Sequence, residues 1–75
     1  MEATQTLDAR GLTCPLPILR TKKALNNLQT GELLRVFATD PGSVNDMAAF
    51  CQQTGNTLVT SQKSGDGLEF FIRKG

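Results

Sequence analysis

The stretch Thr13-Cys14-Pro15-Leu16-Pro17 decides how this chain begins its fold. Proline fits the first turn of a helix, because the N–H it lacks would have no partner there and its φ is already near the helical value. Further inside a helix, each proline would remove a hydrogen bond. The two prolines therefore predict a helix start, with Cys14 at or beside the N-cap, Pro15 near the first helical position and Pro17 near the third.

A cysteine at a helix start has a chemical consequence. The aligned peptide dipoles put partial positive charge at this end, and a thiolate there is stabilised by about 0.3–2 kcal/mol. This stabilisation lowers the pKa of the thiol. Arg10, in the loop before the cysteine, adds to the effect if that loop folds back. We therefore predict that Cys14 is exposed, ionises readily and is the catalytic residue, a nucleophile that accepts a group and passes it on.

The segments around this start follow a simple pattern. Residues 6–9, or 5–9, predict a short strand, which the loop of residues 10–13 joins to the helix. The helix is expected over residues 15–29, because one core-facing stripe runs along it: Ile18, Thr21, Leu25 and Leu28. Gly31 is expected as its C-cap or as a turn residue.

A second strand and a second helix come next. Residues 33–39 are the strongest strand pattern in the chain. The loop after it offers N-cap candidates, and Ser43 with Asp46 resembles a capping box that carries Asp in place of Glu. The helix is expected over residues 44–53, because its apolar residues recur at helical spacing: Val44, Met47, Ala48 and Cys51.

The C-terminal third predicts a hairpin. Strands are expected at residues 57–63 and 68–73, with the Asp66-Gly67 turn signal between them. The order β-α-β-α-β-β predicts a single domain over residues 1–75. Its fold class is α/β (α+β), a two-layer sandwich with two helices on one face of a four-stranded mixed sheet. The crossovers favour parallel pairing, while the order of the strands in the sheet stays open.

Composition excludes several kinds of chemistry. The chain has 75 residues, two cysteines and no histidine. A closed zinc site needs four Cys or His ligands, so a metal site within one chain is not expected, and no cofactor is predicted. Without histidine, neither a Cys-His dyad nor a Ser-His-Asp triad can form within the chain. If a histidine acts as the base that activates Cys14, it must belong to a partner protein.

Charge and hydropathy narrow the partners. Eight Lys and Arg face seven Asp and Glu, for a net charge of +1. This balance predicts neither direct nucleic-acid binding nor membrane binding. No apolar run approaches the length of a membrane span, so we expect a cytoplasmic protein, in a compartment that keeps thiols reduced.

Two further residues have alternative interpretations. Cys51 completes the apolar stripe of the second helix and is expected to be structural; a disulfide with Cys14 would require Cα atoms within about 7 Å. Asp40 follows a strand at the edge of the sheet where the Cys14 loop also emerges. It either orients Cys14 or a partner's group, or it simply starts the Asp-Pro-Gly turn, which is the commoner role.

Two surfaces are also candidates for partner binding. The basic residues Arg20, Lys22 and Lys23 are expected on a solvated helix face, with a docking patch for an acidic partner as the alternative. With only two helices, one sheet face is left uncovered. Phe37 and Phe71 there predict an apolar patch for a partner, or else are ordinary exposed strand residues.

Residues 7–17, Leu-Asp-Ala-Arg-Gly-Leu-Thr-Cys-Pro-Leu-Pro, resemble the TusA/SirA-like sulfur-carrier family, whose hallmark is a Cys-Pro-x-Pro motif after a short strand and loop. The resemblance covers almost the whole chain, to the ending Phe71-Ile72-Arg73-Lys74-Gly75. It implies the same sandwich and a sulfurtransferase in which Cys14 carries sulfur as a persulfide. A cysteine desulfurase would be the donor and another protein the acceptor. Arg10, Pro15, Pro17 and Asp40 would support Cys14.

The resemblance leaves the pathway open. Family members serve tRNA 2-thiouridine formation, molybdenum-cofactor assembly or sulfur oxidation, and the tRNA branch tends to carry an acidic residue where this chain has Leu16. We expect a monomer whose activation is supplied by the partner. Two alternatives remain: a non-catalytic protein-interaction or regulatory module, and a thiol redox protein that would need a resolving cysteine near Cys14.

Overall fold

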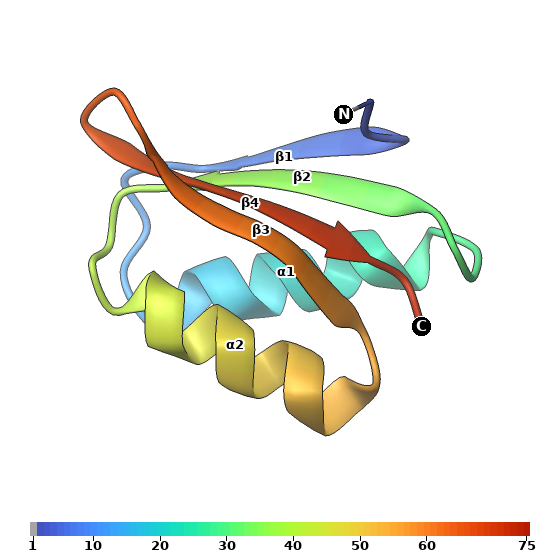
Figure 1. Ribbon diagram of the computed structural model, residues 1–75. Coiled ribbons are helices and arrows are strands. Elements are labelled where there is room, and N and C mark those ends of the chain that lie inside the picture. The colour runs from blue at the N-terminus through green and yellow to red at the C-terminus, as the bar shows by residue number, and fades with distance from the viewer. Residues whose placement is uncertain (1) are drawn as a thin grey trace.

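The computed structural model describes residues 2–75 as a four-stranded sheet with two helices on one face (Figure 1). This confirms the predicted two-layer sandwich and its β-α-β-α-β-β order. The elements are β1 (Gln5–Ala9), α1 (Leu16–Asn26), β2 (Leu33–Ala38), α2 (Ser43–Thr54), β3 (Thr57–Ser64) and β4 (Gly67–Arg73).

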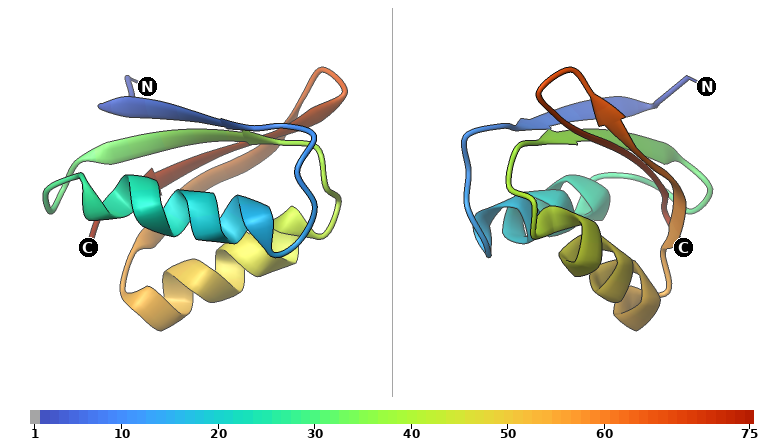
Figure 2. Two further views of the ribbon diagram at one scale, coloured as in Figure 1. Left: turned by 180° about the vertical axis from the view of Figure 1, so that it is seen from behind. Right: turned by 60° about the vertical axis from the view of Figure 1, so that its left-hand side comes forward.

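The strands lie in the order β1-β2-β4-β3. β1 pairs with β2 in parallel, as the first crossover predicts, and β4 pairs antiparallel with both β2 and β3. The tight turn at Gly65 and Asp66 keeps β3 beside β4, so β4 lies between β2 and β3. Both helices cross the same face of the sheet (Figure 2).

The core fills the space between the sheet and the two helices. Its centre is formed by inward-facing side chains of β2 and β4 that are fully buried: Leu34, Val36, Ala38, Phe70 and Ile72. α1 contributes Leu25 and Thr21 to this core. Thr21 can be buried because its hydroxyl donates to the Pro17 carbonyl at 2.8 Å, one turn earlier in the same helix.

α1 is shorter than the sequence predicts. It begins at Leu16, with Pro15 as its N-cap and Pro17 in its first turn, so Cys14 lies one residue outside the N-cap. The helix ends at Asn26 rather than at residue 29, because the next two N–H groups bond to carbonyls three residues back and tighten the turn. Gly31, at φ +91°, is the turn glycine and not the C-cap.

The predicted capping box of α2 is wrong. The N-cap is Gly42, and no side chain caps this helix. Asp40 forms the turn instead, since its Oδ1 accepts the Gly42 N–H at 3.1 Å and its carbonyl accepts the Ser43 N–H at 3.0 Å. Ser43 becomes the first helical residue, and its buried hydroxyl has no hydrogen-bond partner among the described residues.

The side of α2 that faces the core differs in part from the predicted stripe. Met47 and Cys51 are buried, as the apolar stripe predicts. Val44 and Ala48 are exposed, so that half of the predicted stripe is wrong. Ser43 takes the inward position in the first turn in place of Val44, because it lies on the same face of the helix as Met47 and Cys51, four and eight residues later.

The sheet face away from the helices does not carry the predicted apolar patch. The Arg35 guanidinium lies over the rings of Phe37 and Phe71, 4.6 Å and 5.7 Å from their centroids, and Phe71 is only 7% exposed. Arg35 also pairs with Glu69, which accepts a hydrogen bond from Gln62 at 2.6 Å. These polar contacts hold the pKa of Glu69 below its usual value and cover the aromatic rings.

Candidate functional site

Two loops meet at the end of the molecule where β1 and β2 both finish (left side of Figure 1). Because these strands are parallel, the β1–α1 loop and the β2–α2 loop emerge at the same edge. Thr39 Oγ1 accepts the Gly11 N–H at 2.9 Å, and Asp40 Oδ2 accepts the Cys14 N–H at 2.9 Å. Consecutive side chains of one loop therefore hold the other loop at two points.

Asp40 serves both of the roles that the sequence left as alternatives. One carboxylate oxygen closes the turn that begins α2, and the other binds the backbone of Cys14. The sequence pattern does not indicate Thr39 as a site residue, because Thr39 is the last residue of the predicted strand. A threonine at the carboxyl end of a parallel strand, directly before a turn-forming aspartate, is the signal that could have indicated it.

The two cysteines lie in opposite environments. Both are free thiols; Cys14 is exposed, whereas Cys51 is 2% exposed within the core. An external reagent can therefore reach the thiol of Cys14 but not that of Cys51. No disulfide joins them.

The surroundings of Cys14 act against the ready ionisation that the sequence predicts. Hydrogen bonding of its side chain to Asp46, partial desolvation and the charges of Asp46 and Asp40 raise the pKa of this thiol. The helix start does not offset them, because Cys14 lies outside the N-cap and the first N–H of the helix, at Leu16, donates to the Thr13 carbonyl at 2.9 Å.

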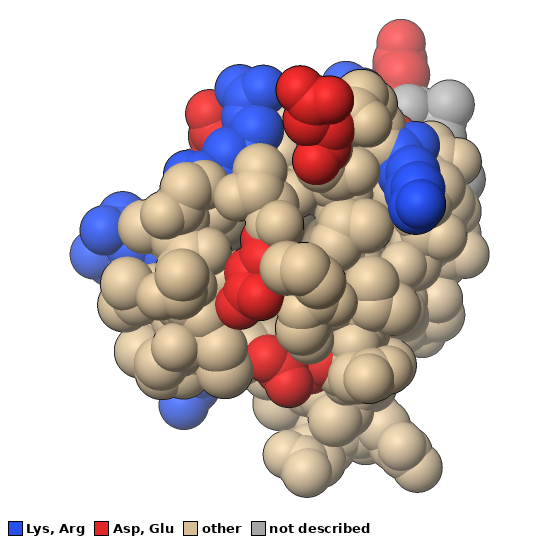
Figure 3. Space-filling model, turned by 90° about the vertical axis from the view of Figure 1, so that its left-hand side faces the viewer, with Lys and Arg blue, Asp and Glu red and all other residues tan. Residues whose placement is uncertain are grey.

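Arg10 does not assist the sulfur either. Its guanidinium makes two hydrogen bonds of 2.9 Å with the Asp8 carboxylate and lies over the Phe37 ring, 5.6 Å from its centroid. The pair holds the pKa of Asp8 down at about 2. Figure 3, which looks onto this end of the molecule, shows carboxylates in the middle of the face and basic side chains at its rim.

The prolines shape the approach to Cys14. The Cys14–Pro15 peptide bond is cis, Pro15 caps α1, and Pro17 is buried in the first turn. Around this start, three large apolar side chains remain exposed in the first turns of the two helices: Leu16 (42%), Leu19 (55%) and Val44 (39%). We call these three residues the apolar collar. Its members lie at the starts of α1 and α2, at the end of the molecule where the loop that carries Cys14 emerges.

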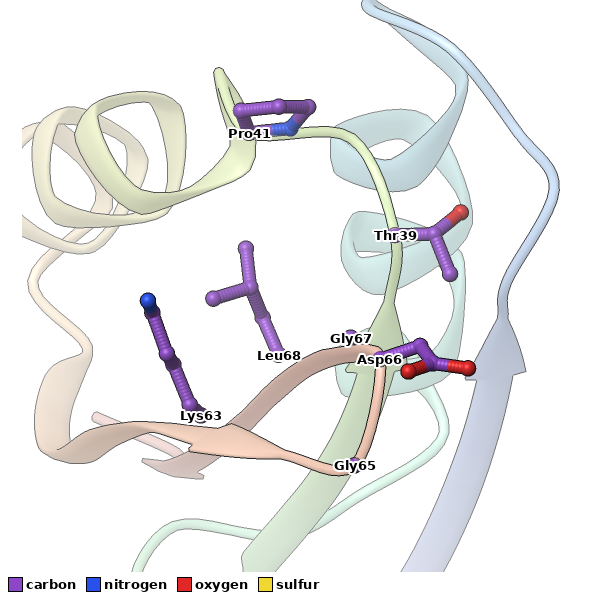
Figure 4. A pocket seen from close by; sticks show the side chains of 7 residues that line it. All are labelled: Thr39, Pro41, Lys63, Gly65, Asp66, Gly67 and Leu68. Carbon is purple, nitrogen blue, oxygen red and sulfur yellow. The ribbon is translucent and has the colours of Figure 1, made fainter.

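A recess of about 330 Å³ lies on the other side of the β2–α2 loop (Figure 4). Lys63 and Leu68 point into it beneath Pro41, while the side chains of Thr39 and Asp66 point away. Cys14 is not among the residues that line it. The recess is therefore separate from the site around the sulfur.

Three further observations on residues 2–75 concern metal ligands, membrane-spanning helices and the basic residues of α1. In this range no three Cys, Asp or Glu side chains are grouped so that they could hold a metal ion. None of the helices described has the length and apolar character needed to cross a membrane. The basic residues of α1 are exposed and take no part in the ion pairs of the described residues: Arg20, Lys22 and Lys23.

Comparisons with known proteins agree along nearly the whole chain. The family model described as sulfurtransferase TusA matches residues 5–74. The sulfur carrier protein TusA of Allochromatium vinosum is 57% identical over 70 residues, which cover 93% of this chain and 92% of that protein. A putative sulfur carrier protein of Bacillus subtilis is 48% identical over 75 residues, with both chains covered completely.

A solved structure is similar as well. The SirA-like protein of Desulfitobacterium hafniense superposes on this chain with a TM-score of 0.83 at 28% identity. The match covers 96% of this chain and 99% of the other. The two-layer sandwich described above is therefore also the fold of that protein.

Proposed function

This chain belongs to the TusA family of sulfur carriers, and on that premise we propose that Cys14 carries the sulfur, as a persulfide. One observation supports this choice above the others. Of the two free thiols, Cys14 is exposed between two loops and Cys51 is buried in the core. Sulfur transfer between proteins requires that one cysteine sulfur reach another, which a core position prevents.

The proposed chemistry is a redox-neutral exchange. The thiolate of Cys14 attacks the outer sulfur of a persulfide held by the donor's cysteine, and the thiol proton passes to water or to a base of the partner. A new S–S bond forms at Cys14 Sγ, the donor's S–S bond breaks, and the donor's thiolate leaves with the electron pair. Delivery repeats the exchange, with an acceptor's thiolate attacking the outer sulfur on Cys14. No oxidant and no cofactor of this chain is needed.

We assign the donor role to a cysteine desulfurase and the acceptor role to a protein cysteine of a sulfur-relay pathway. The apolar collar supports a docking site around Cys14, because exposed apolar side chains at one end of a small domain are typical of partner contacts. Donor and acceptor must both reach the same sulfur. They therefore bind in turn and compete for the collar.

The remaining assignments follow from this relay. The chain acts as a sulfurtransferase whose activation comes from its partner, since it has no histidine to serve as base. It works as a monomer in the cytoplasm, where free thiols persist. Asp40 fixes the backbone of Cys14, and Pro15 and Pro17 fix the start of α1 beneath it. Arg10 has no direct part, because it is paired with Asp8.

The test is loading by a cysteine desulfurase with isotopically labelled cysteine. We expect label on the wild-type chain and on Cys51→Ser, together with a mass gain of one sulfur atom that a reductant removes. Cys14→Ser should take up none. Label on Cys14→Ser equal to that on wild type, or an unlabelled wild type, would reject Cys14 as the carrier.

A further inference from the structure

The recess beside the β2–α2 loop is bounded by segments that the fold holds in place (Figure 4). One side is the β3–β4 hairpin, which turns at Gly65 with φ +59°. The hairpin passes so close to the end of β2 that a Cβ at Gly67 would lie 2.7 Å from the Ala38 carbonyl oxygen. Half-buried Leu68 follows directly and points into the recess. Backbone contacts therefore fix two sides of the recess relative to each other.

Lys63 gives this recess a single positive charge. Its side chain points inward beneath Pro41, and it belongs to neither of the ion pairs formed within residues 2–75. The other charged residue of the lining, Asp66, points its carboxylate away. One ammonium beside apolar Leu68 suits a ligand with one negative charge and a short hydrocarbon part, as in a glutamate or aspartate side chain. A phosphate group carries about two charges and would require further donors.

The size of the recess also suits a side chain. Its volume of about 330 Å³ is at the lower end of the roughly 300–1,000 Å³ that is typical of pockets for small molecules. Such pockets bury most of the surface of their ligand. This recess instead has room for an acidic side chain with one apolar neighbour, presented from the surface of another protein.

The recess adjoins the site around Cys14 across one loop. Thr39 and Pro41 line the recess, and Asp40 between them accepts the Cys14 N–H at 2.9 Å. A standard protein interface covers roughly 800 Å² on each partner, a patch about 30 Å across. The whole molecule measures only 30 × 24 × 17 Å. A protein whose sulfur reaches Cys14 therefore extends over the recess as well.

We propose that the recess receives an acidic side chain of the cysteine desulfurase that donates sulfur to Cys14; this inference rests on the proposed function. The partner's carboxylate pairs with the Lys63 ammonium, and its methylene groups lie against Leu68. The recess thus orients the partner, while the exchange of sulfur takes place at Cys14. Such complementarity of charge selects an acidic partner and disfavours one with a basic group at the same place.

The deciding experiment measures both the binding and the loading of carrier variants by a cysteine desulfurase. Surface plasmon resonance without substrate cysteine gives Kd, and initial loading rates against carrier concentration give KM and kcat. For Lys63→Glu we expect Kd and KM to rise about 5–10-fold with kcat unchanged, because an attractive pair becomes a repulsive one. Lys63→Gln should raise both about 2–5-fold. These differences should shrink as the salt concentration rises.

Two controls separate this effect from general charge and from folding. Arg73→Glu makes the same change in net charge at the opposite end of β4 and should leave Kd unchanged. Lys63→Arg keeps the positive charge and should restore most of the affinity. Circular dichroism reports whether each variant is folded, and Lys63→Gln decides the question if Lys63→Glu is not.

Equal affinity of Lys63→Glu and wild type would overturn the proposal, as would an equal loss in Arg73→Glu. A free carboxylate as the occupant is tested by titrating the ¹⁵N-labelled wild-type chain with glutarate. If the amide signals of Gly65 and Leu68 shift while every Lys63 variant binds the desulfurase normally, the recess is a small-molecule site and the proposal is wrong.

The two readouts distinguish this proposal from the proposed function. If the desulfurase binds through Lys63 but leaves Cys14 unloaded, the proposed function fails and the role of the recess stands. If Cys14 is loaded with the same KM in every Lys63 variant, the recess fails and the proposed function stands. A desulfurase that neither binds nor loads the wild-type chain would overturn both.

Discussion

The two cysteines of this chain have raised pKa values for different physical reasons. At Cys51 the cause is burial, which penalises the charged form. The pKa of Cys14, an exposed residue, is raised first by hydrogen bonding to Asp46, then by partial desolvation and by the charges of Asp46 and Asp40. Burial cannot be relieved without unfolding, whereas a carboxylate can be neutralised by a partner. Access, and not ready ionisation, therefore distinguishes the exposed sulfur of Cys14 from the buried sulfur of Cys51.

The largest expected effect is on reagent access. Under native conditions, Cys14 should react with a maleimide at least about 100-fold faster than Cys51, because a core thiol reacts only when the structure opens. Quenched time courses with peptide mass spectrometry would give both rates, and in denaturant the two should become similar. Comparable native rates would remove the distinction between the two sites.

Stability should show the opposite ranking. Cys51→Ser places a hydroxyl in the core without an assured partner and should lower the free energy of unfolding by about 1–3 kcal/mol. Cys14→Ser changes an exposed side chain and should alter it by less than about 0.5 kcal/mol. Urea denaturation followed by circular dichroism measures both. Equal losses would mean that Cys14 also contributes to packing.

A smaller effect on stability is expected for the two hydrogen bonds between the loops. Thr39→Val removes the acceptor of the Gly11 N–H and should lower the free energy of unfolding by about 0.5–1.5 kcal/mol. Asp40→Asn keeps an oxygen acceptor for the Cys14 N–H and should have a weaker effect. Amide hydrogen exchange at Gly11 and Cys14 would localise each change. If the Gly11 amide is equally protected from exchange in Thr39→Val, the Gly11–Thr39 hydrogen bond does not hold the loop.

The smallest effect is expected for the ion pair between Asp8 and Arg10, which keeps the Arg10 guanidinium away from Cys14. The pKa of Asp8, about 2 in the fold against an ordinary 3.8, is lowered by Arg10. A lowered pKa means that the pair stabilises the fold above pH 3.8 and that this contribution is lost as the pH falls through about 2. Melting curves of wild type and Asp8→Asn should differ slightly at neutral pH and converge in acid. A constant difference at all pH values would show that Arg10 is not committed to Asp8.

Much of the fold was predictable because local rules and tertiary packing agree. The strands and the hairpin turn at Gly65 and Asp66 follow from alternation and turn chemistry. The first turn of α1 follows from Pro15 and Pro17 to within one residue. The errors lie at the ends of the helices, where local hydrogen bonds decide the boundary. Asp40 forms the turn before α2, so that Gly42 and not Ser43 is the N-cap, and Ser43 lies on the buried face with Met47.

Electrostatics were the least predictable part of the site. The dipole of α1 favours an acidic thiol when only local sequence is considered. In the fold, Asp46, more than thirty positions further along the chain, raises the pKa of Cys14. Arg10 does not lower it, because its guanidinium is paired with Asp8. On the open sheet face, Arg35 covers two phenylalanine rings that the sequence could assign only to an exposed strand face. Such pairings depend on distances between segments, which periodicity does not encode.

The order of the elements, the place where the first helix starts and the cysteine beside it could all be predicted from the amino-acid sequence. Proline chemistry, apolar periodicity and glycine turns act over a few residues and are therefore legible in the chain. That Thr39 and Asp40 hold the Cys14 loop depends on how the two loops meet in the folded chain. The parallel pairing of β1 and β2 brings those groups to one edge, and charge acts through space rather than along the backbone.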